Sequence, residues 1–276
     1  MTNVQQEADI QPLIAAVRNS AKYRTVSQDL IRYLIEHELR AGRTEKETVK
    51  AVKSKLHQVA GAYFPGRARY RQWLLQLQRA AQTGDEAWRE ACCQVMGHHA
   101  STRERLPILN RFYVETLAEV GAVDSVLDVA CGLNPLSIPW MPLAENARYI
   151  ACDIYEDLAT FLDAFLKLAD LQGEGRVCDL INTAPPDAVM LALVLKTLPP
   201  LEQIDKAAGI NLLRRLKAKY LLVSFPVQSL GGRKKGMAAN YEARFQEVIG
   251  GEGWPVKQFK FETELAFLIE KPFVIE

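Results

Sequence analysis

The sequence lacks the segments that send a protein to or across a membrane. Its first residues, MTNVQQEADI, are polar and have neither the basic start nor the apolar core of a signal peptide. The longest strongly apolar run, Ala188 to Leu195, is far too short to span a bilayer. We therefore expect a cytoplasmic protein with no membrane partner.

Cysteine is scarce and follows no disulfide or zinc-binding pattern. The five cysteines are Cys92, Cys93, Cys131, Cys152 and Cys178. An odd number without a regular framework favours the reduced thiols of the cytosol. Cys92 and Cys93 precede His98 and His99, but structural zinc sites usually space their cysteines two to four residues apart. We predict no metal site and expect small thiols packed within a helix.

An excess of charge of one sign is also missing overall, because the formal net charge is only +1. The charges are nevertheless unevenly distributed. Residues 1–80 contain fourteen Lys and Arg against seven Asp and Glu, and the rest of the chain contains 20 against 26. This asymmetry favours contact between the N-terminal part and a polyanion. The alternative is a solvated, basic helical surface.

Strand-like alternation is absent before residue 125, and the first hundred residues have helical spacing. Ser27 is expected to cap a helix whose apolar positions between Leu30 and Leu39 fall on one face. Thr44 and Glu47 form a capping box that opens the next helix. Two further helices are predicted over 69–82 and 85–98. A second capping box is predicted at Ser101 and Glu104.

Basic residues mark the polar side of the second helix, and three arginines interleaved with aromatic residues follow it. These side chains are the predicted contacts to nucleic acid in the N-terminal part: Lys46, Lys50, Lys53, Arg67, Arg69 and Arg71.

The pattern changes after residue 125 to short, almost continuously apolar runs that alternate with helical segments. Buried strands are predicted over 125–130, 148–154, 176–180, 188–195 and 220–225, with helices over 155–172 and 202–217. This alternation is typical of an α/β protein with a parallel sheet covered on both faces. Residues 257–261 and 265–270 resemble a hairpin that closes the sheet with an antiparallel strand. We predict a helical domain over 1–105 and the sheet domain over 106–276.

Small or acidic residues follow three of these strands. Gly132 lies in a tight turn after the first strand, where the backbone could approach a nucleoside closely, although a plain strand-to-helix turn is the alternative. Asp153 ends the second strand and could accept hydrogen bonds from both hydroxyls of a ribose. Asp179 ends the third and could bind the amino group of an adenine. The carboxyl ends of neighbouring parallel strands meet at one edge of a sheet, so these residues are expected to lie around one crevice.

The glycines that a dinucleotide needs are missing. Only Gly132 is present, so the turn is not the G-x-G-x-x-G fingerprint that holds a pyrophosphate. S-adenosylmethionine has an adenosyl group but no pyrophosphate. Together with the antiparallel hairpin, the missing glycines favour S-adenosylmethionine over NAD, although a dehydrogenase stays possible.

Several cations are predicted to surround this crevice. Lys196, at the end of the fourth strand, either contacts an RNA phosphate, orients the acceptor or is a plain surface lysine. Arg233, Lys234 and Lys235 lie between glycines in a loop after the fifth strand, where they are expected to bind phosphate. Arg105 could neutralise the carboxylate of the methionine moiety of S-adenosylmethionine, for which the sequence suggests no other partner.

Five segments together make a family resemblance. They are His99–Pro107, Asp128–Leu136, Pro139–Met141, Leu195–Pro199 and Ser229–Met237. These segments resemble motifs of the aminoglycoside-resistance 16S ribosomal RNA methyltransferases that modify N7 of guanine 1405 in the decoding site. The resemblance extends from about Lys22 to Lys271.

The resemblance implies a Rossmann-like class I methyltransferase sheet, preceded by a helical domain that docks on the assembled 30S subunit. It also implies a set of residues around S-adenosylmethionine. With those placed by the strand ends, the predicted donor-binding residues are Tyr63, His99, Ala100, Ser101, Arg105, Ala130, Gly132, Asp153, Ile154, Asp179, Leu180, Leu195 and Ile204. Lys196, Glu202 and Arg233 match positions associated with the target nucleotide.

The chain departs from the family pattern at three places. Tyr63 lies where some relatives have Phe, which keeps a stacking ring. Ile204 replaces a residue that is polar in some members, and the stretch INTAPPD after Asp179 lacks a basic residue found in some relatives. Two alternatives to the family activity stay open. One is a methyltransferase acting on another RNA or a small molecule, and the other is a non-catalytic ribosome-binding protein. A monomer is the default expectation.

Overall fold

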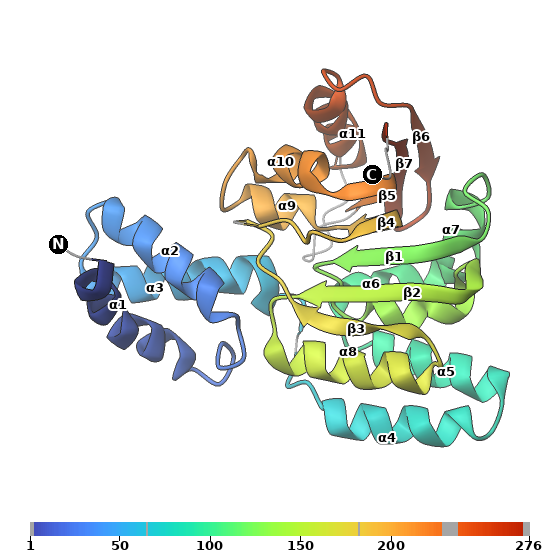
Figure 1. Ribbon diagram of the computed structural model, residues 1–276, viewed down its shortest axis with the longest axis horizontal. Coiled ribbons are helices and arrows are strands. Elements are labelled where there is room, and N and C mark those ends of the chain that lie inside the picture. The colour runs from blue at the N-terminus through green and yellow to red at the C-terminus, as the bar shows by residue number, and fades with distance from the viewer. Residues whose placement is uncertain (1–2, 65, 182, 228–236, 273–276) are drawn as a thin grey trace.

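A seven-stranded sheet forms the centre of the molecule (Figure 1). The structure is a computed structural model and describes residues 3–64, 66–181, 183–227 and 237–272. The strands are β1 (Val123–Val129), β2 (Leu143–Asp153), β3 (Gln172–Val177), β4 (Ala188–Leu195), β5 (Lys217–Pro226), β6 (Val256–Lys260) and β7 (Glu264–Glu270). Their order is β3-β2-β1-β4-β5-β7-β6. The first five strands are parallel, and β7 runs antiparallel to both β5 and β6. The predicted α/β sheet with a closing hairpin is confirmed.

Alternate residues of each central strand face two separate hydrophobic clusters, as the period of two in a strand requires. On one face, Val126 of β1 packs with Phe165 of α8 (Glu156–Leu168). On the other face, Leu127 of β1 belongs to the buried cluster that includes Leu212 of α10 (Ala208–Arg215) and Phe245 of α11 (Met237–Ile249). Because both faces are covered, the strands need apolar side chains at nearly every position.

The first three helices form a group beyond the carboxyl ends of the parallel strands (Figure 1). They are α1 (Asn3–Arg18), α2 (Gln28–Arg40) and α3 (Glu45–Leu56), and a π-helical turn, η1 (His57–Gly61), follows. The predicted cap at Ser27 and the capping box of Thr44 and Glu47 are both present. No helix of the described residues has the length and apolar character needed to cross a bilayer.

Backbone hydrogen bonds join this helical group to the end of β2. The Ser27 amide donates to the Ile154 carbonyl at 2.8 Å, and the Glu156 amide donates to the Thr25 carbonyl at 2.7 Å. Val26 and Tyr155 form an isolated antiparallel bridge between them. The segment before α2 is therefore fixed beside the carboxyl end of the sheet.

Two more helices, α4 (Tyr70–Ala81) and α5 (Asp85–Met96), pack on the outer side of α8 (Figure 1). Tyr70 stacks on Phe161 with ring centroids 5.2 Å apart, and Trp88 stacks on Phe165 at 5.5 Å. These contacts join both helices to the layer that covers the sheet. Because α4 and α5 pack on the layer that covers the sheet, these contacts favour a domain boundary before α4. The boundary predicted after residue 105 stays a prediction.

Three local predictions are wrong. The third strand begins at Gln172 and ends at Val177, so the preceding helix is shorter than expected and Asp179 lies beyond the strand. Gly173 and Gly175 interrupt the apolar pattern by which this strand could be recognised in the sequence. A Cβ at Gly173 would lie 1.8 Å from the Tyr149 carbonyl oxygen, and one at Gly175 would lie 2.0 Å from that of Ala159.

The predicted helix over 202–217 is two helices, α9 (Leu198–Glu202) and α10, with a turn between them. The second predicted capping box is also absent. His99 is the N-cap of α6 (Ala100–Arg105), so Ser101 lies inside the helix, and Glu104 instead accepts a hydrogen bond from Lys196. The remaining short elements are η2 (Leu106–Ile108), α7 (Leu109–Thr116) and η3 (Asn134–Trp140).

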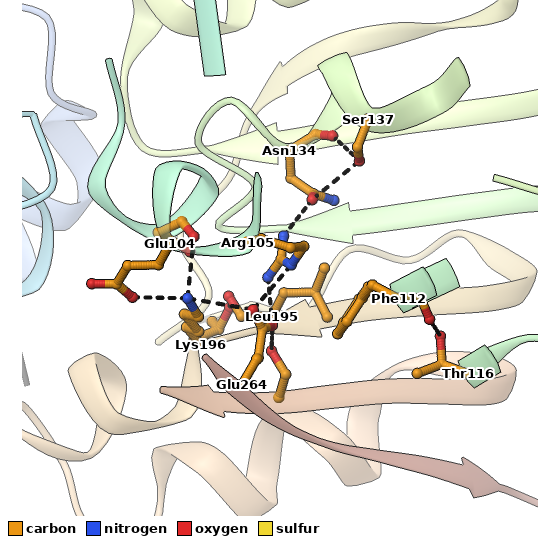
Figure 2. Close-up of polar contacts among 12 residues, drawn as sticks. Glu104, Arg105, Phe112, Thr116, Asn134, Ser137, Leu195, Lys196 and Glu264 are labelled. Atoms are coloured by element: carbon orange, nitrogen blue, oxygen red, sulfur yellow. Dashed lines mark hydrogen bonds and ion pairs between the residues drawn. The ribbon is translucent and has the colours of Figure 1, made fainter. Parts of the chain in front are cut away.

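A buried ion pair joins α6 to β7 (Figure 2). The side chains of Arg105 and Glu264 are both 0% exposed, and their atoms Nη2 and Oε1 lie 2.6 Å apart. Arg105 also donates through Nη1 to Asn134 at 2.6 Å, and the Ser224 hydroxyl donates to Glu264 at 2.5 Å. Lys196 lies 3.4 Å from the same carboxylate. Burial raises the pKa of Glu264, but Arg105 and Lys196 outweigh burial and lower it.

We expect the substitution Glu264→Gln to destabilise the protein strongly, because it leaves the buried Arg105 without its counter-charge. Breaking a buried pair from one side costs about 3–5 kcal/mol. Urea unfolding would measure this loss in the free energy of unfolding. The double substitution Arg105→Met with Glu264→Leu should cost less than the single substitutions Arg105→Met and Glu264→Leu added together. Glu115→Gln, which breaks the exposed pair with Arg111, is the control and should cost less than about 1 kcal/mol.

Candidate cofactor pocket

A pocket lies at the carboxyl ends of β1, β2 and β4, between the sheet and the first helices. The empty space within it, including the open solvent at its mouth, is about 760 Å³. The predicted residues that line it are Tyr63, His99, Ser101, Ala130, Asp153, Ile154, Asp179, Leu180, Leu195, Lys196 and Ile204. The structure thus brings together residues from seven separate parts of the chain.

Asp153 and the turn at Gly132 are bonded to one another. The Asp153 side chain accepts hydrogen bonds from the Gly132 amide at 2.9 Å and from the Ile154 amide at 2.7 Å. Burial raises the pKa of Asp153, and these backbone donors partly oppose it. Gly132 has a φ of +52°, and a Cβ there would lie 2.5 Å from the His99 ring. Glycine is therefore required both by the backbone conformation and by the close ring.

Two residues beside the pocket have left-handed backbone conformations that side chains usually avoid. Ala130 follows β1 with a φ of 49°, and Lys196 follows β4 with a φ of 58°. Such conformations cost roughly 1–3 kcal/mol each and concentrate at functional sites. Their position at the ends of adjacent strands supports a binding role for this edge.

His99 forms a neutral, polar wall of the pocket. Tyr63 stacks on its ring with centroids 5.7 Å apart, and Phe64 contacts its edge at 4.7 Å. The residue is 7% exposed, and its Nδ1 atom has no hydrogen-bond partner in the described part of the chain. Burial lowers the pKa of His99 to about 3, and the charges of Lys196 and Arg105 add to the effect. An unpaired buried nitrogen beside the pocket indicates a polar ligand.

The chemistry of these residues fits an adenosyl ligand. Asp153 supplies a buried carboxylate for ribose hydroxyls, and the apolar side chains of Leu180, Leu201 and Ile204 line a slot for a flat base. The left-handed turn at Gly132 lets the His99 ring lie directly against the backbone at this side of the pocket. No glycine is among the described residues that line the pocket.

Comparison with known proteins identifies the family. Residues 19–268 match the family model described as "Ribosomal RNA methyltransferase (FmrO)". The chain belongs to this family. A relative named 16S rRNA (guanine(1405)-N(7))-methyltransferase, from Frankia casuarinae, is 38% identical over 96% of this chain and 95% of its own length.

Two further comparisons agree with this family membership. A relative of the same name from Micromonospora echinospora is 35% identical over 98% of this chain and all of its own length. The crystal structure of the 16S rRNA methyltransferase RmtF in complex with S-adenosyl-L-homocysteine has a TM-score of 0.77 at 28% identity, covering 98% of this chain and 99% of that one. The similarity therefore includes the N-terminal helices as well as the sheet.

The pocket of this methyltransferase includes residues that sequence reasoning missed: Leu30, Val59, Phe64, Tyr155, Ile181, Thr197, Pro200 and Leu201. Several of them adjoin predicted residues, so extending each motif by one position would have found Phe64, Tyr155 and Thr197. Leu30 and Val59 gave no such signal. Leu30 belongs to the apolar face of α2, and only the docking of the first helices brings it to the sheet.

Three predicted donor-binding residues have other surroundings. Arg105 does not line the pocket, because its guanidinium is bound by Glu264 and Asn134; its predicted role toward the donor carboxylate stays a prediction. Ala100 is buried and donates its amide to the Tyr63 carbonyl at 2.8 Å. Gly132 does not line the pocket, and its amide donates to Asp153.

Glu202 and Lys196 are both ion-paired. Glu202 lies on α9 and forms an ion pair with Arg244 of α11 at 2.7 Å. The interpretation of Lys196 as a surface lysine is wrong, because its side chain is only 3% exposed and lies 2.9 Å from Glu104. An RNA phosphate could contact it only if these bonds were exchanged. Arg233, Lys234 and Lys235 lie outside the described residues.

The neutrality of His99 predicts a pH effect on stability in the absence of ligand. The folded state keeps His99 unprotonated down to about pH 3, whereas an unfolded chain binds the proton below about pH 6.5. Because the unfolded state then binds more protons, the free energy of unfolding falls as the pH drops through this window. The variant His99→Gln lacks this contribution.

We therefore expect the difference in unfolding free energy between wild type and His99→Gln to shrink by about 2 kcal/mol from pH 7 to pH 5. Urea unfolding at the two pH values measures this difference. If the difference in unfolding free energy were the same at pH 7 and pH 5, His99 would titrate normally in the folded protein.

Proposed function

We propose that this methyltransferase transfers a methyl group from S-adenosylmethionine to N7 of guanine 1405 in 16S rRNA, within the assembled 30S subunit in the cytoplasm. A methyl group there would confer aminoglycoside resistance, and we propose that the enzyme acts as a monomer. The proposal is carried by a pocket fit for an adenosyl donor in a chain that matches relatives of that named activity over nearly its whole length.

Donor binding would use the residues that meet in the pocket. Asp153 would bind the ribose hydroxyls, Asp179 and the neighbouring Leu180 would bind the adenine, and the unpaired Nδ1 of His99 would accept a hydrogen bond from the donor or the acceptor. When bound, S-adenosylmethionine supplies a methyl group activated by its positively charged sulfur. The chain's own task is then to orient the acceptor.

No general base is required for this acceptor. Guanine N7 has an in-plane lone pair and no proton to lose, so the rate depends on holding N7 in line with the methyl group at close range. Tyr63, His99 and Lys196 belong to the pocket wall and restrict the space in which a base can lie. We therefore assign no acid–base residue, and keep Lys196, Glu202 and Arg233 as proposed target-positioning residues.

The charges around the pocket suit a base that becomes positive during the reaction. Lys196 is neutralised by Glu104 at 2.9 Å, and Arg105 is neutralised by Glu264 at 2.6 Å. The pocket therefore does not present uncompensated cations from these two side chains to the methylated guanine. A preorganised field of this kind avoids opposing the charge that develops in the transition state.

The proposed RNA-binding surface lies on and after α3. Lys46 and Lys50 are exposed on that helix, Lys53 is half-buried, and Arg67, Arg69 and Arg71 are exposed before and within α4. Cations free to meet phosphates supply most of the salt-dependent affinity for nucleic acid. That affinity would offset the few kcal/mol needed to take a guanine out of its stack.

The substitution Asp153→Ala should strongly weaken donor binding and methylation. It removes a buried carboxylate whose hydrogen bonds to the ribose are worth about 1.5–3 kcal/mol each. We expect the Kd for S-adenosylmethionine, measured by calorimetry, to rise about 100-fold or more. Methylation of purified 30S subunits, mapped by mass spectrometry of 16S rRNA, should fall with it.

Asp124→Ala is the matched control for this experiment, because Asp124 is exposed at the opposite end of β1. It should leave both donor affinity and methylation unchanged. If wild-type protein bound the donor but methylated free RNA or a small molecule as well as it methylated 30S subunits, the proposed substrate would be wrong.

The double substitution Lys46→Gln with Lys50→Gln should weaken 30S binding without affecting the donor site. Removing two phosphate contacts should reduce the slope of log K against log salt concentration by about 2. Fluorescence anisotropy with labelled protein at several salt concentrations measures this slope. The matched control is Lys217→Gln with Lys219→Gln, two exposed lysines of β5, which should leave it unchanged. An equal loss in both double variants would place the RNA contacts elsewhere.

A further inference from the structure

Each of the three strand-end residues around the pocket follows directly after a cysteine. The pairs are Cys131 with Gly132, Cys152 with Asp153, and Cys178 with Asp179. All five cysteines of the chain are free thiols. Any chemistry at these three thiols would therefore act on backbone that adjoins the proposed donor site.

Cys152 and Cys178 lie on the same face of the sheet. Cys152 of β2 is in register with Arg176 of β3, and Cys178 lies two residues further, which returns its side chain to that face. The Cys178 amide donates to the Asp153 carbonyl at 2.9 Å and so continues the strand pairing past the end of β3. Both thiols belong to one hydrophobic environment, because Cys152 is part of a buried cluster and Cys178 packs against the same cluster.

The two thiols differ in access and in acidity. Cys152 is buried, whereas Cys178 is half-exposed. The polar influence of the neighbouring Cys152 thiol lowers the pKa of Cys178, and the charge of Arg176 adds to this effect, against the opposing effect of burial. Cys93, the other half-exposed cysteine, has its pKa raised by burial. Because the thiolate is the reactive form, an oxidant should select Cys178 over Cys93.

We propose that Cys152 and Cys178 form an oxidisable thiol pair, which a peroxide converts to a disulfide that disables the neighbouring donor site. The Cys178 thiolate attacks one oxygen of hydrogen peroxide, so that an S–O bond forms, the O–O bond breaks and hydroxide leaves. The sulfur of Cys152 then attacks the sulfur of Cys178, which forms the S–S bond and releases the second oxygen as water with the Cys152 proton. Two thiols are oxidised, and one peroxide is reduced to two waters.

The disulfide would act on the pocket through the next two residues of the chain. A disulfide holds its two Cα atoms about 5.5–6 Å apart and restricts the torsion about the S–S bond. It therefore fixes residue 178 against β2, and Asp179 and Leu180, which follow, line the pocket. Cys152 likewise adjoins Asp153. This consequence rests on the proposed donor-binding function, whereas formation of the disulfide does not.

The first experiment maps the oxidation itself. Purified full-length protein is treated with hydrogen peroxide, alkylated under non-reducing conditions and analysed by peptide mass spectrometry. We expect a peptide linked through Cys152 and Cys178 that dithiothreitol removes, while Cys93 is alkylated as in untreated protein. Equal oxidation of Cys93, or oxidation of Cys178 to a sulfinic acid with no linked peptide, would overturn the proposal.

The second experiment measures the Kd for S-adenosylmethionine by calorimetry before and after peroxide. Wild type should lose at least tenfold in affinity and regain it with dithiothreitol, Cys178→Ser should keep its affinity throughout, and Cys93→Ser should behave like wild type. Cys152→Ala provides a second variant that cannot form the disulfide, and it too should keep its affinity. Unchanged affinity in wild type that carries the mapped disulfide would refute the regulatory effect. Absence of donor binding by the reduced protein would instead refute the proposed function.

Discussion

The buried pair of Arg105 and Glu264 is the interaction on which the site depends most. The two residues are 159 positions apart in the chain, and one precedes the sheet while the other opens its antiparallel strand β7. Moving both charges out of water costs several kcal/mol per ion, so the pair is tolerated only when its geometry and its additional hydrogen bonds are complete. Asn134 and Ser224 supply those bonds. The turn after β1, the end of β5 and the start of β7 must therefore assemble around α6.

The same charges set the electrostatics of the pocket. Lys196 lies between Glu264 and Glu104, in a strained backbone conformation at the end of β4. Its charge and that of Arg105 help to keep His99 neutral, and each of these two cations is paired with a carboxylate. The network thus provides a neutral hydrogen-bond acceptor and a compensated wall on the side of the pocket formed by α6. The same network of ion pairs therefore holds the elements around α6 together and sets the charges on this side of the pocket.

The sequence predicted those parts of the fold that rest on local patterns. Continuous apolar runs revealed β4 and β5, and the cap at Ser27 was recognisable because its bonds span only three residues. Strand β3 was misplaced because Gly173 and Gly175 serve close backbone packing, which leaves no apolar pattern. At the site, the rule that strand ends converge placed Gly132 and Asp153 together. No local pattern could pair Arg105 with Glu264, because that contact exists only in the folded chain.

The docking of the first helices connects the two halves of the proposed activity. The backbone bonds between residues 25–27 and 154–156 hold the start of α2 beside the end of β2, directly after Asp153. As a result, Leu30 of α2 forms part of the pocket wall. The α2–α3 unit that carries the exposed lysines is therefore also a component of the pocket, and it cannot shift as a body without moving that wall. A chain built in this way would position the acceptor and the methyl donor through one contact, because the element that would bind RNA and the strand that would bind the nucleoside share a backbone junction.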